Sequence, residues 1–176
     1  MMTLTHSKKN KNMILPFSTQ MNGKPTYFVE KILRSIDLHH SIFIKNFWLA
    51  TGYNRFDIPL LTPKIHTIRE DKNDRWQEGK RIDFFINCRQ KDMFRFAPVL
   101  PVVSIQEVLM TYSYNDLIQI SIDDIELFGH IERLEFARND GFDTWEDFFN
   151  YFYPKIIAAP KQVYTAKLIH WTDLKY

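Results

Sequence analysis

A short segment near the middle of the chain carries three polar side chains whose types suit nucleophilic or anion-binding chemistry. Lys64, Thr67 and Arg69 follow one another as Lys-x-x-Thr-x-Arg. A hydroxyl beside a lysine of lowered pKa can act as an activated nucleophile, and an arginine can hold a phosphate or an oxyanion. The competing interpretation is an edge strand whose charges lie on a solvated face.

The segment is predicted to be a strand over residues 65–70, which decides where its side chains point. In an ideal strand Thr67 and Arg69 share one face, whereas His66 lies on the other. Lys64 follows Pro63 at the entrance of the strand, and simple alternation places it opposite Thr67. The two side chains meet only if the entrance is bulged or turned.

The remaining chain contains several short strand patterns and three short helix patterns. Strands are predicted at 13–17, 81–87, within 94–110, at 117–122 and at 162–171, with a polar hairpin loop over 71–80. Helices are predicted from Thr26 through Ser35, over 125–138 with Asp123 or Asp124 as cap, and from Thr144 to Pro154. Because helices and strands do not alternate regularly, the pattern favours an α+β fold, a small mostly antiparallel β-barrel with about three short helices packed at its ends.

Composition narrows the class of protein. The 176 residues suit one domain, and 45% apolar with 25% charged residues exclude disordered and collagen-like chains. A net charge of +2 is too small to indicate nucleic-acid binding by itself. Cys88 is the single cysteine, and the six histidines lack chelating spacings, so no metal site is expected.

Domain organisation follows from where apolar residues begin. Residues 1–12 are predicted to be a disordered tail, and 13–176 to be the domain, with an irregular insert at 37–62. The apolar stretch after the basic residues is too short for a signal peptide and is interrupted by Pro16. We therefore expect a cytoplasmic protein without a membrane segment, whose start is either Met1 or Met13.

The polar segment resembles the signature of the ASCH domains. The resemblance rests on Lys64, Thr67 and Arg69, on Asp74-Arg75-Trp76-x-x-Gly79 and on the apolar strand that follows. ASCH domains are small β-barrels of the PUA-like superfamily and are associated with RNA binding. Their typical pattern is Gly-x-Lys-x-x-Glu-x-Arg, whereas this chain has Thr62 and Thr67 at the glycine and glutamate positions.

Threonine at the glutamate position resembles one branch in particular, the small bacterial amidohydrolases that deacetylate 4-acetylcytidine. The resemblance spans residues 63–141 and implies Asp140 as the counterpart of that branch's glutamate. It implies amide hydrolysis, in which Thr67 supplies the hydroxyl and Lys64 acts as base. Asp140 would protonate or orient the leaving amine, and Arg69 would hold the oxyanion or a phosphate. No cofactor is implied.

Three functions remain open at this stage. The preferred one is recognition of RNA or a modified nucleoside, with amide hydrolysis as its enzymatic version. For binding, Trp76 or Phe17 would stack a base, and His66 either lines the cleft or is a structural histidine. The third function is a protein–protein adaptor. Convergence of Lys64, Thr67, Arg69 and Asp140 in one concave pocket would favour the first two.

Overall fold

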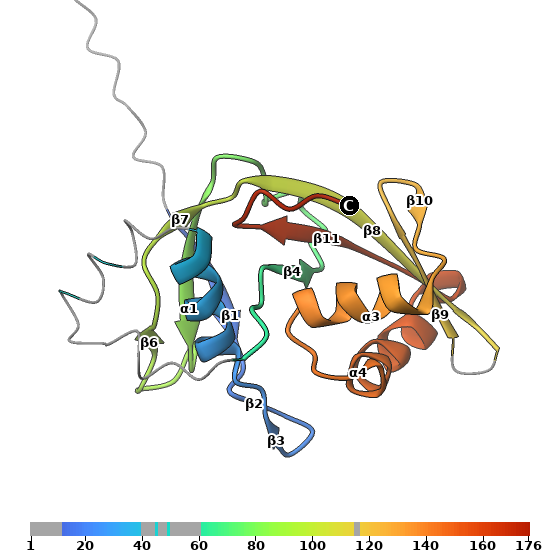
Figure 1. Ribbon diagram of the computed structural model, residues 1–176, viewed down its shortest axis with the longest axis horizontal. Helices are drawn as coiled ribbons and strands as arrows, with labels where there is room; N and C mark the ends of the chain where they lie inside the picture. Colours follow the sequence, from blue (N-terminus) through green and yellow to red (C-terminus); the bar gives the residue numbers. More distant parts are fainter. Residues whose placement is uncertain (1–11, 40–44, 46–48, 50–60, 115–116) are drawn as a thin grey trace, which may run out of the picture.

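Two larger sheets, a two-stranded hairpin and three α-helices make up most of the regular structure in the part of the chain that the computed structural model describes (Figure 1). The described residues are 12–39, 45, 49, 61–114 and 117–176. The smaller sheet joins β1 (Met13–Phe17) in parallel to β5 (Arg81–Ile86). The short strands β6 (Phe94–Arg95) and β7 (Leu100–Pro101) pair antiparallel with β5. Helix α1 (Phe28–His39) lies beside this sheet.

Alternation along β1 and β5 builds the first core. Leu15 and Phe17 of β1 and Ile82 and Phe84 of β5 are buried, and Leu15 pairs with Phe84 in the register. They pack in one cluster with the apolar face of α1, which consists of Ile32, Leu33 and Ile36. Apolar side chains recurring every three or four residues therefore fix this helix against the sheet.

The larger sheet has the strand order β10-β9-β8-β11-β4, with antiparallel neighbours throughout. Its strands are β4 (His66–Arg69), β8 (Ser104–Ser113), β9 (Leu117–Ile122), β10 (Ile125–Glu126) and β11 (Val163–His170). Helices α3 (His130–Asn139) and α4 (Trp145–Ala158) pack on it, and a 3-10 turn (Pro160–Gln162) leads into β11. The second core lies between these helices and the sheet.

The predicted α+β class and mostly antiparallel pairing are confirmed, but a closed barrel is not found. Within the described ranges no strand ladder joins the smaller sheet to the larger one. The link from β7 to β8 is bonded to both sheets, because the Val102 N–H donates to Lys80 O at 2.7 Å and the Val103 N–H donates to His170 O at 2.8 Å. The two sheets have two core clusters, and the first cluster includes Ile169 of β11.

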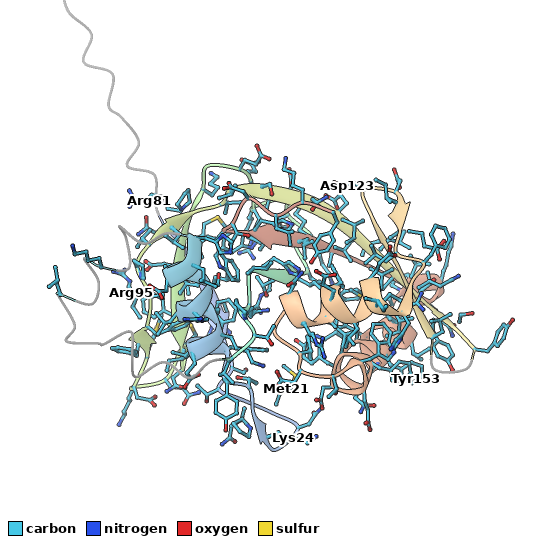
Figure 2. The ribbon with its side chains drawn as sticks, viewed as in Figure 1. Met21, Lys24, Arg81, Arg95, Asp123 and Tyr153 are labelled. Carbon is cyan, nitrogen blue, oxygen red and sulfur yellow. The ribbon has the colours of Figure 1, made fainter. Side chains whose placement is uncertain are left out.

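A small hairpin connects the two halves. β2 (Gln20–Met21) and β3 (Lys24–Pro25) are joined by an Asn22-Gly23 turn, as predicted. Met21 packs against both core clusters, and Figure 2 shows its side chain between the two halves. Lys24 Nζ lies 3.4 Å from Asp147 Oδ1 on α4.

Two predicted helix boundaries are wrong. Residues 125–138 are not one helix, because Asp123 and Asp124 adopt positive φ angles and turn the chain into β10 before α3 begins at His130. Pro154 lies inside α4 rather than ending it. Burial of Ile156 on the same apolar stripe as Phe152 offsets the backbone hydrogen bond that proline cannot donate.

Two other differences concern connections. Residues 71–80 form a loop as expected, but they join the two sheets instead of closing a hairpin. α1 continues past Ser35 to His39, into the expected insert at 37–62. The rest of that insert up to residue 60, apart from positions 45 and 49, and the tail up to residue 11 lie outside the described residues. No helix in the described part is both long and apolar enough to cross a membrane.

Candidate functional site

A cavity of about 500 Å³ lies where the two halves meet, and four predicted residues line it together. They are Lys64, Thr67, Arg69 and Asp140. Phe17, a predicted base-stacking residue, also lines it. The cavity falls within the usual size of small-ligand sites. Residues from β1, β4, α1 and the turn after α3 therefore converge on one concave surface.

Lys64 and Asp140 form a buried ion pair on the cavity wall. Lys64 Nζ lies 2.7 Å from Asp140 Oδ1 and also donates to the Asp140 carbonyl oxygen. The same carboxylate oxygen accepts the N–H of Ile68 at 3.2 Å. Only 2% and 6% of the two side chains are exposed. Because a buried ion pair is weak evidence for stability, its position beside a cavity favours a functional role.

Local backbone geometry explains how the pair forms. The Ile65 N–H donates to Asn139 O at 2.9 Å, so the entrance of β4 is tied to the end of α3. Gly141 follows with φ +94°, and a Cβ there would lie 2.9 Å from Lys64 Cδ and 2.9 Å from Phe28 Cε1. Glycine therefore permits both the helix stop and the close approach of the Lys64 stem.

Thr67 and Arg69 present polar groups to the same cavity from β4. Thr67 is 3% exposed, and its hydroxyl forms no hydrogen bond with any described residue. Arg69 donates from Nη2 to Pro16 O at 2.6 Å, and its guanidinium carbon lies 5.1 Å from the Phe17 ring centre. β4 is an edge strand, as the competing interpretation held, but Thr67 is buried rather than solvated.

Aromatic side chains form much of the remaining wall. Phe17, Phe28, Phe142 and Tyr151 all line the cavity. Lys64 Nζ lies 4.9 Å from the Phe28 ring centre, and Phe17 and Phe28 contact each other edge to face at 6.3 Å. Ring faces offset part of the cost of burying a cation and offer surfaces on which a flat ligand can stack.

Burial dominates the electrostatics of the site. It lowers the pKa of Lys64 from 10.5 to about 8, against the attraction of Asp140, and Arg69 lowers it further. Burial alone would raise the pKa of Asp140, but the charge of Lys64 and the contact with His66 outweigh it and hold that pKa below its usual value. Asp140 is thus a carboxylate, and Lys64 can lose its proton near neutral pH.

His66 does not line this cavity. Its ring lies on the opposite face of β4, where Nε2 is 2.8 Å from the Tyr176 hydroxyl and Nδ1 is 3.7 Å from Asp140 Oδ1. The Asn139 amide donates to the same hydroxyl at 2.8 Å. His66 therefore lies behind Asp140 and not among the residues that line the cavity, and its contact with a substrate stays a prediction.

Trp76 is also not on the cavity wall. It is 5% exposed and packs in the first core cluster, and its N–H donates to Asp71 Oδ2 at 2.7 Å. The structure thus places Trp76 in the first core and away from the residues that line this cavity, and its role in base stacking stays a prediction. The aromatic positions that do line the cavity beside Phe17 come from α1, the 140–142 turn and α4, which local patterns do not connect.

Several lining residues were not singled out from the sequence. Asn87, Cys88 and Gln90, in the loop after β5, contribute a polar rim, and Phe28 and Tyr151 contribute rings. Phe28 was assigned to a buried helix face, and no local signal distinguishes a core ring from a wall ring. Within the described ranges, no group of three or more His, Cys, Asp or Glu side chains could hold a metal ion.

No protein-family model, curated protein or solved structure matches the chain.

Proposed function

We propose that this cavity recognises a modified nucleoside, free or within single-stranded RNA, as an ASCH-like domain would. The observation that carries the proposal is the buried Lys64–Asp140 pair on the wall of a ring-lined cavity of about 500 Å³. Aromatic faces stack bases without regard to sequence, and polar side chains read base edges. Phe17, Phe28 and Tyr151 would supply the faces.

The polar rim supports the same ligand class. Asn87 and Gln90 carry amides that donate and accept, which suits the mixed edge of a pyrimidine. The Thr67 hydroxyl, which has no hydrogen bond to a described residue, can also donate to a ligand. A protein–protein adaptor needs no such cavity, so the convergence of these groups counts against that function.

Amide hydrolysis of an N-acylated cytidine is the second candidate, and the lowered pKa of Lys64 favours it. At pH 7 a group of pKa about 8 is roughly one-tenth neutral, enough to act as a base. The Thr67 hydroxyl would add to the amide carbonyl while Lys64 accepts its proton. Collapse would break the C–N bond as Lys64 returns the proton to the leaving amine, and water would then hydrolyse the threonine ester to the free acid.

In this scheme Asp140 orients Lys64 instead of protonating the amine, because its lowered pKa keeps it ionised. Arg69 faces the developing oxyanion or a neighbouring anion. In this scheme Lys64 alone carries the proton from the Thr67 hydroxyl to the leaving amine.

The test is incubation of the purified protein with 4-acetylcytidine, followed by chromatography for cytidine and acetate. Loss of turnover in Thr67→Ala, retained in the exposed control Thr165→Ala, would support hydrolysis. Thr67→Ala removes no charge, so it is preferred to Lys64→Ala, which strands the Asp140 carboxylate; a thermal melt checks both variants. Calorimetric binding without turnover would support recognition alone. If the protein neither binds nor hydrolyses 4-acetylcytidine, the proposal is overturned.

A further inference from the structure

The charged side chains on the cavity wall do not balance. Among the described lining residues they are Lys64, Arg69 and Asp140, two cations and one anion. Lys64 and Asp140 neutralise each other at 2.7 Å. The positive charge of Arg69 is therefore left over at the surface of the cavity.

Arg69 has no carboxylate partner among the described residues. Its one hydrogen bond goes to the neutral Pro16 carbonyl, and its Nε is buried without a partner. Burial lowers the pKa of Arg69, with Asp140 acting in the opposite direction, yet a guanidinium stays protonated in proteins. A cation partly removed from water without a counter-ion is costly, and a ligand anion would remove that cost.

Arg69 also lies at a boundary between two hollows. A second cavity of about 440 Å³ lies on the outer side of β1, and Pro16 and Arg69 line both cavities. Arg75, whose side chain is 65% exposed and forms an ion pair with Asp71, lines the second one together with Glu70. A group held at Arg69 therefore has space on both sides, one occupied by the ring-lined pocket and the other open to a continuing chain.

We infer that the ligand carries a phosphate ester that binds Arg69, so that the site takes a nucleotide or an RNA strand in preference to a free nucleoside. The inference rests on the proposed function for the identity of the base. The guanidinium can give a phosphate two parallel hydrogen bonds, which distinguishes it from a point charge such as Lys. The source of the phosphate, mononucleotide or polynucleotide, is left to the experiment.

The first arm compares binding of 4-acetylcytidine and its 5′-monophosphate to Thr67→Ala, in which turnover is blocked, by calorimetry at low and high salt. We expect the monophosphate to bind about tenfold more tightly at low salt, the size of one charge-assisted hydrogen bond, and the gap to narrow with salt. Adding Arg69→Gln should remove the gap and change nucleoside affinity less than about threefold.

Arg81→Gln is the matched control. Arg81 is exposed at the start of β5, whereas the cavity uses residues just after the end of that strand, and Figure 2 shows it on the far side of the molecule from Met21. The Arg81→Gln variant should keep the full difference in affinity between the nucleoside and its monophosphate. Arg69→Lys, which retains charge but not the fork of donors, should keep part of it. A short cytidine-containing RNA that binds more tightly than the mononucleotide would identify RNA as the source, and equal affinity would identify the mononucleotide.

The second arm needs no nucleoside, because Cys88, the single cysteine, lines the same cavity. An unbalanced positive charge should favour alkylation by the anionic iodoacetate over the neutral iodoacetamide, relative to free cysteine. Arg69→Gln should slow iodoacetate severalfold and leave iodoacetamide unchanged. Inorganic phosphate should protect Cys88 from iodoacetate in the wild type but not in Arg69→Gln.

The outcomes separate the two proposals. Equal affinity for nucleoside and monophosphate overturns the phosphate inference and leaves the proposed function standing. If neither ligand binds to Thr67→Ala or to the wild type, the proposed function falls; phosphate protection that depends on Arg69 then supports an anion site, and its absence overturns that site as well.

Discussion

The two faces of β4 treat polar groups in opposite ways. On the cavity face, the Thr67 hydroxyl has no hydrogen bond among the described residues and Arg69 has no counter-ion there. On the back face, His66 meets Tyr176 and Asn139 in a buried network. On the back face the Tyr176 hydroxyl serves both His66 Nε2 and the Asn139 amide, although His66 Nδ1 has no hydrogen-bond partner among the described residues; the cavity face leaves the Thr67 hydroxyl and the charge of Arg69 for a ligand. A site is thus recognised by what its polar groups lack, as well as by which groups it contains.

The back face also fixes how His66 meets Asp140. The Asn139 amide donates to the Tyr176 oxygen, so the single hydroxyl proton is best directed to His66 Nε2. His66 Nδ1 then carries the hydrogen and faces the Asp140 carboxylate at 3.7 Å, whereas the other tautomer would aim a lone pair at it. Burial lowers the pKa of His66, so the ring stays neutral.

The largest expected effect comes from breaking the buried pair that lies between the faces. Asp140→Ala removes the carboxylate and leaves Lys64 buried without a counter-ion, which should lower the free energy of unfolding by about 3–5 kcal/mol. Urea denaturation measures it. Lys24→Ala is the control, since this side chain is 76% exposed in its ion pair with Asp147, and it should cost less than about 1 kcal/mol. Equal losses would mean that the Lys64–Asp140 pair is hydrated.

Gly141→Ala should come next. The new Cβ would lie 2.9 Å from the Lys64 stem and from Phe28, at a φ that disfavours side chains, so a loss of about 2–4 kcal/mol is expected. Gly79→Ala has a similar φ of +75° with nothing within 4 Å, so it reports backbone strain alone. Thermal unfolding of both variants isolates the contact with Lys64, and identical shifts would contradict that close approach.

Stability should rise with pH because of Lys64. The unfolded chain keeps this proton up to about pH 10.5, whereas the folded protein releases it near pH 8, so between these values the unfolded state binds more protons. The full gain is about 3 kcal/mol at about 1.4 kcal/mol per pKa unit, and it is absent below pH 8.

The measurement is the difference in unfolding free energy between the wild type and Lys64→Met from pH 7 to 11. The difference is needed because Lys167, whose pKa is raised chiefly by its hydrogen bond to Asp74, contributes stability that is lost as pH rises through its folded pKa. A flat difference curve would show that Lys64 titrates normally in the folded protein.

The smallest effect on stability tests the division of labour between the faces. Tyr176→Phe leaves His66 and Asn139 without a partner and should cost about 1–3 kcal/mol in urea, with little change in ligand affinity. Thr67→Ala should lower ligand affinity with little change in stability. Tyr114→Phe, exposed, is the control for the lost hydroxyl. If Tyr176→Phe and Thr67→Ala both changed stability and neither changed ligand affinity, the cavity face of β4 would have no role in ligand binding.

The local sequence pattern was enough to predict an element where the alternation of buried side chains or a single turn determines its bounds. β1 and β9 have the predicted bounds, the Asn22-Gly23 turn is present, and Thr144 caps α4. The local pattern did not predict the structure at Pro154 or at the Asp123-Asp124 turn, because there it depends on whether a downstream residue is buried or pairs with a strand. The closed barrel was not found for the same reason, since local sequence does not determine which strand edges pair.

By itself, the sequence determined the kinds of chemistry available: Lys64, Thr67 and Arg69 in one short segment, and an Asp-Gly stop after a helix. Only the tertiary structure decided that Asp140 lies 2.7 Å from Lys64, across 76 residues, and that His66 and Trp76 lie away from the cavity wall. The physical reason is that residue type sets charge and hydrogen-bonding capacity, whereas burial and long-range packing set which of those capacities stay unmet.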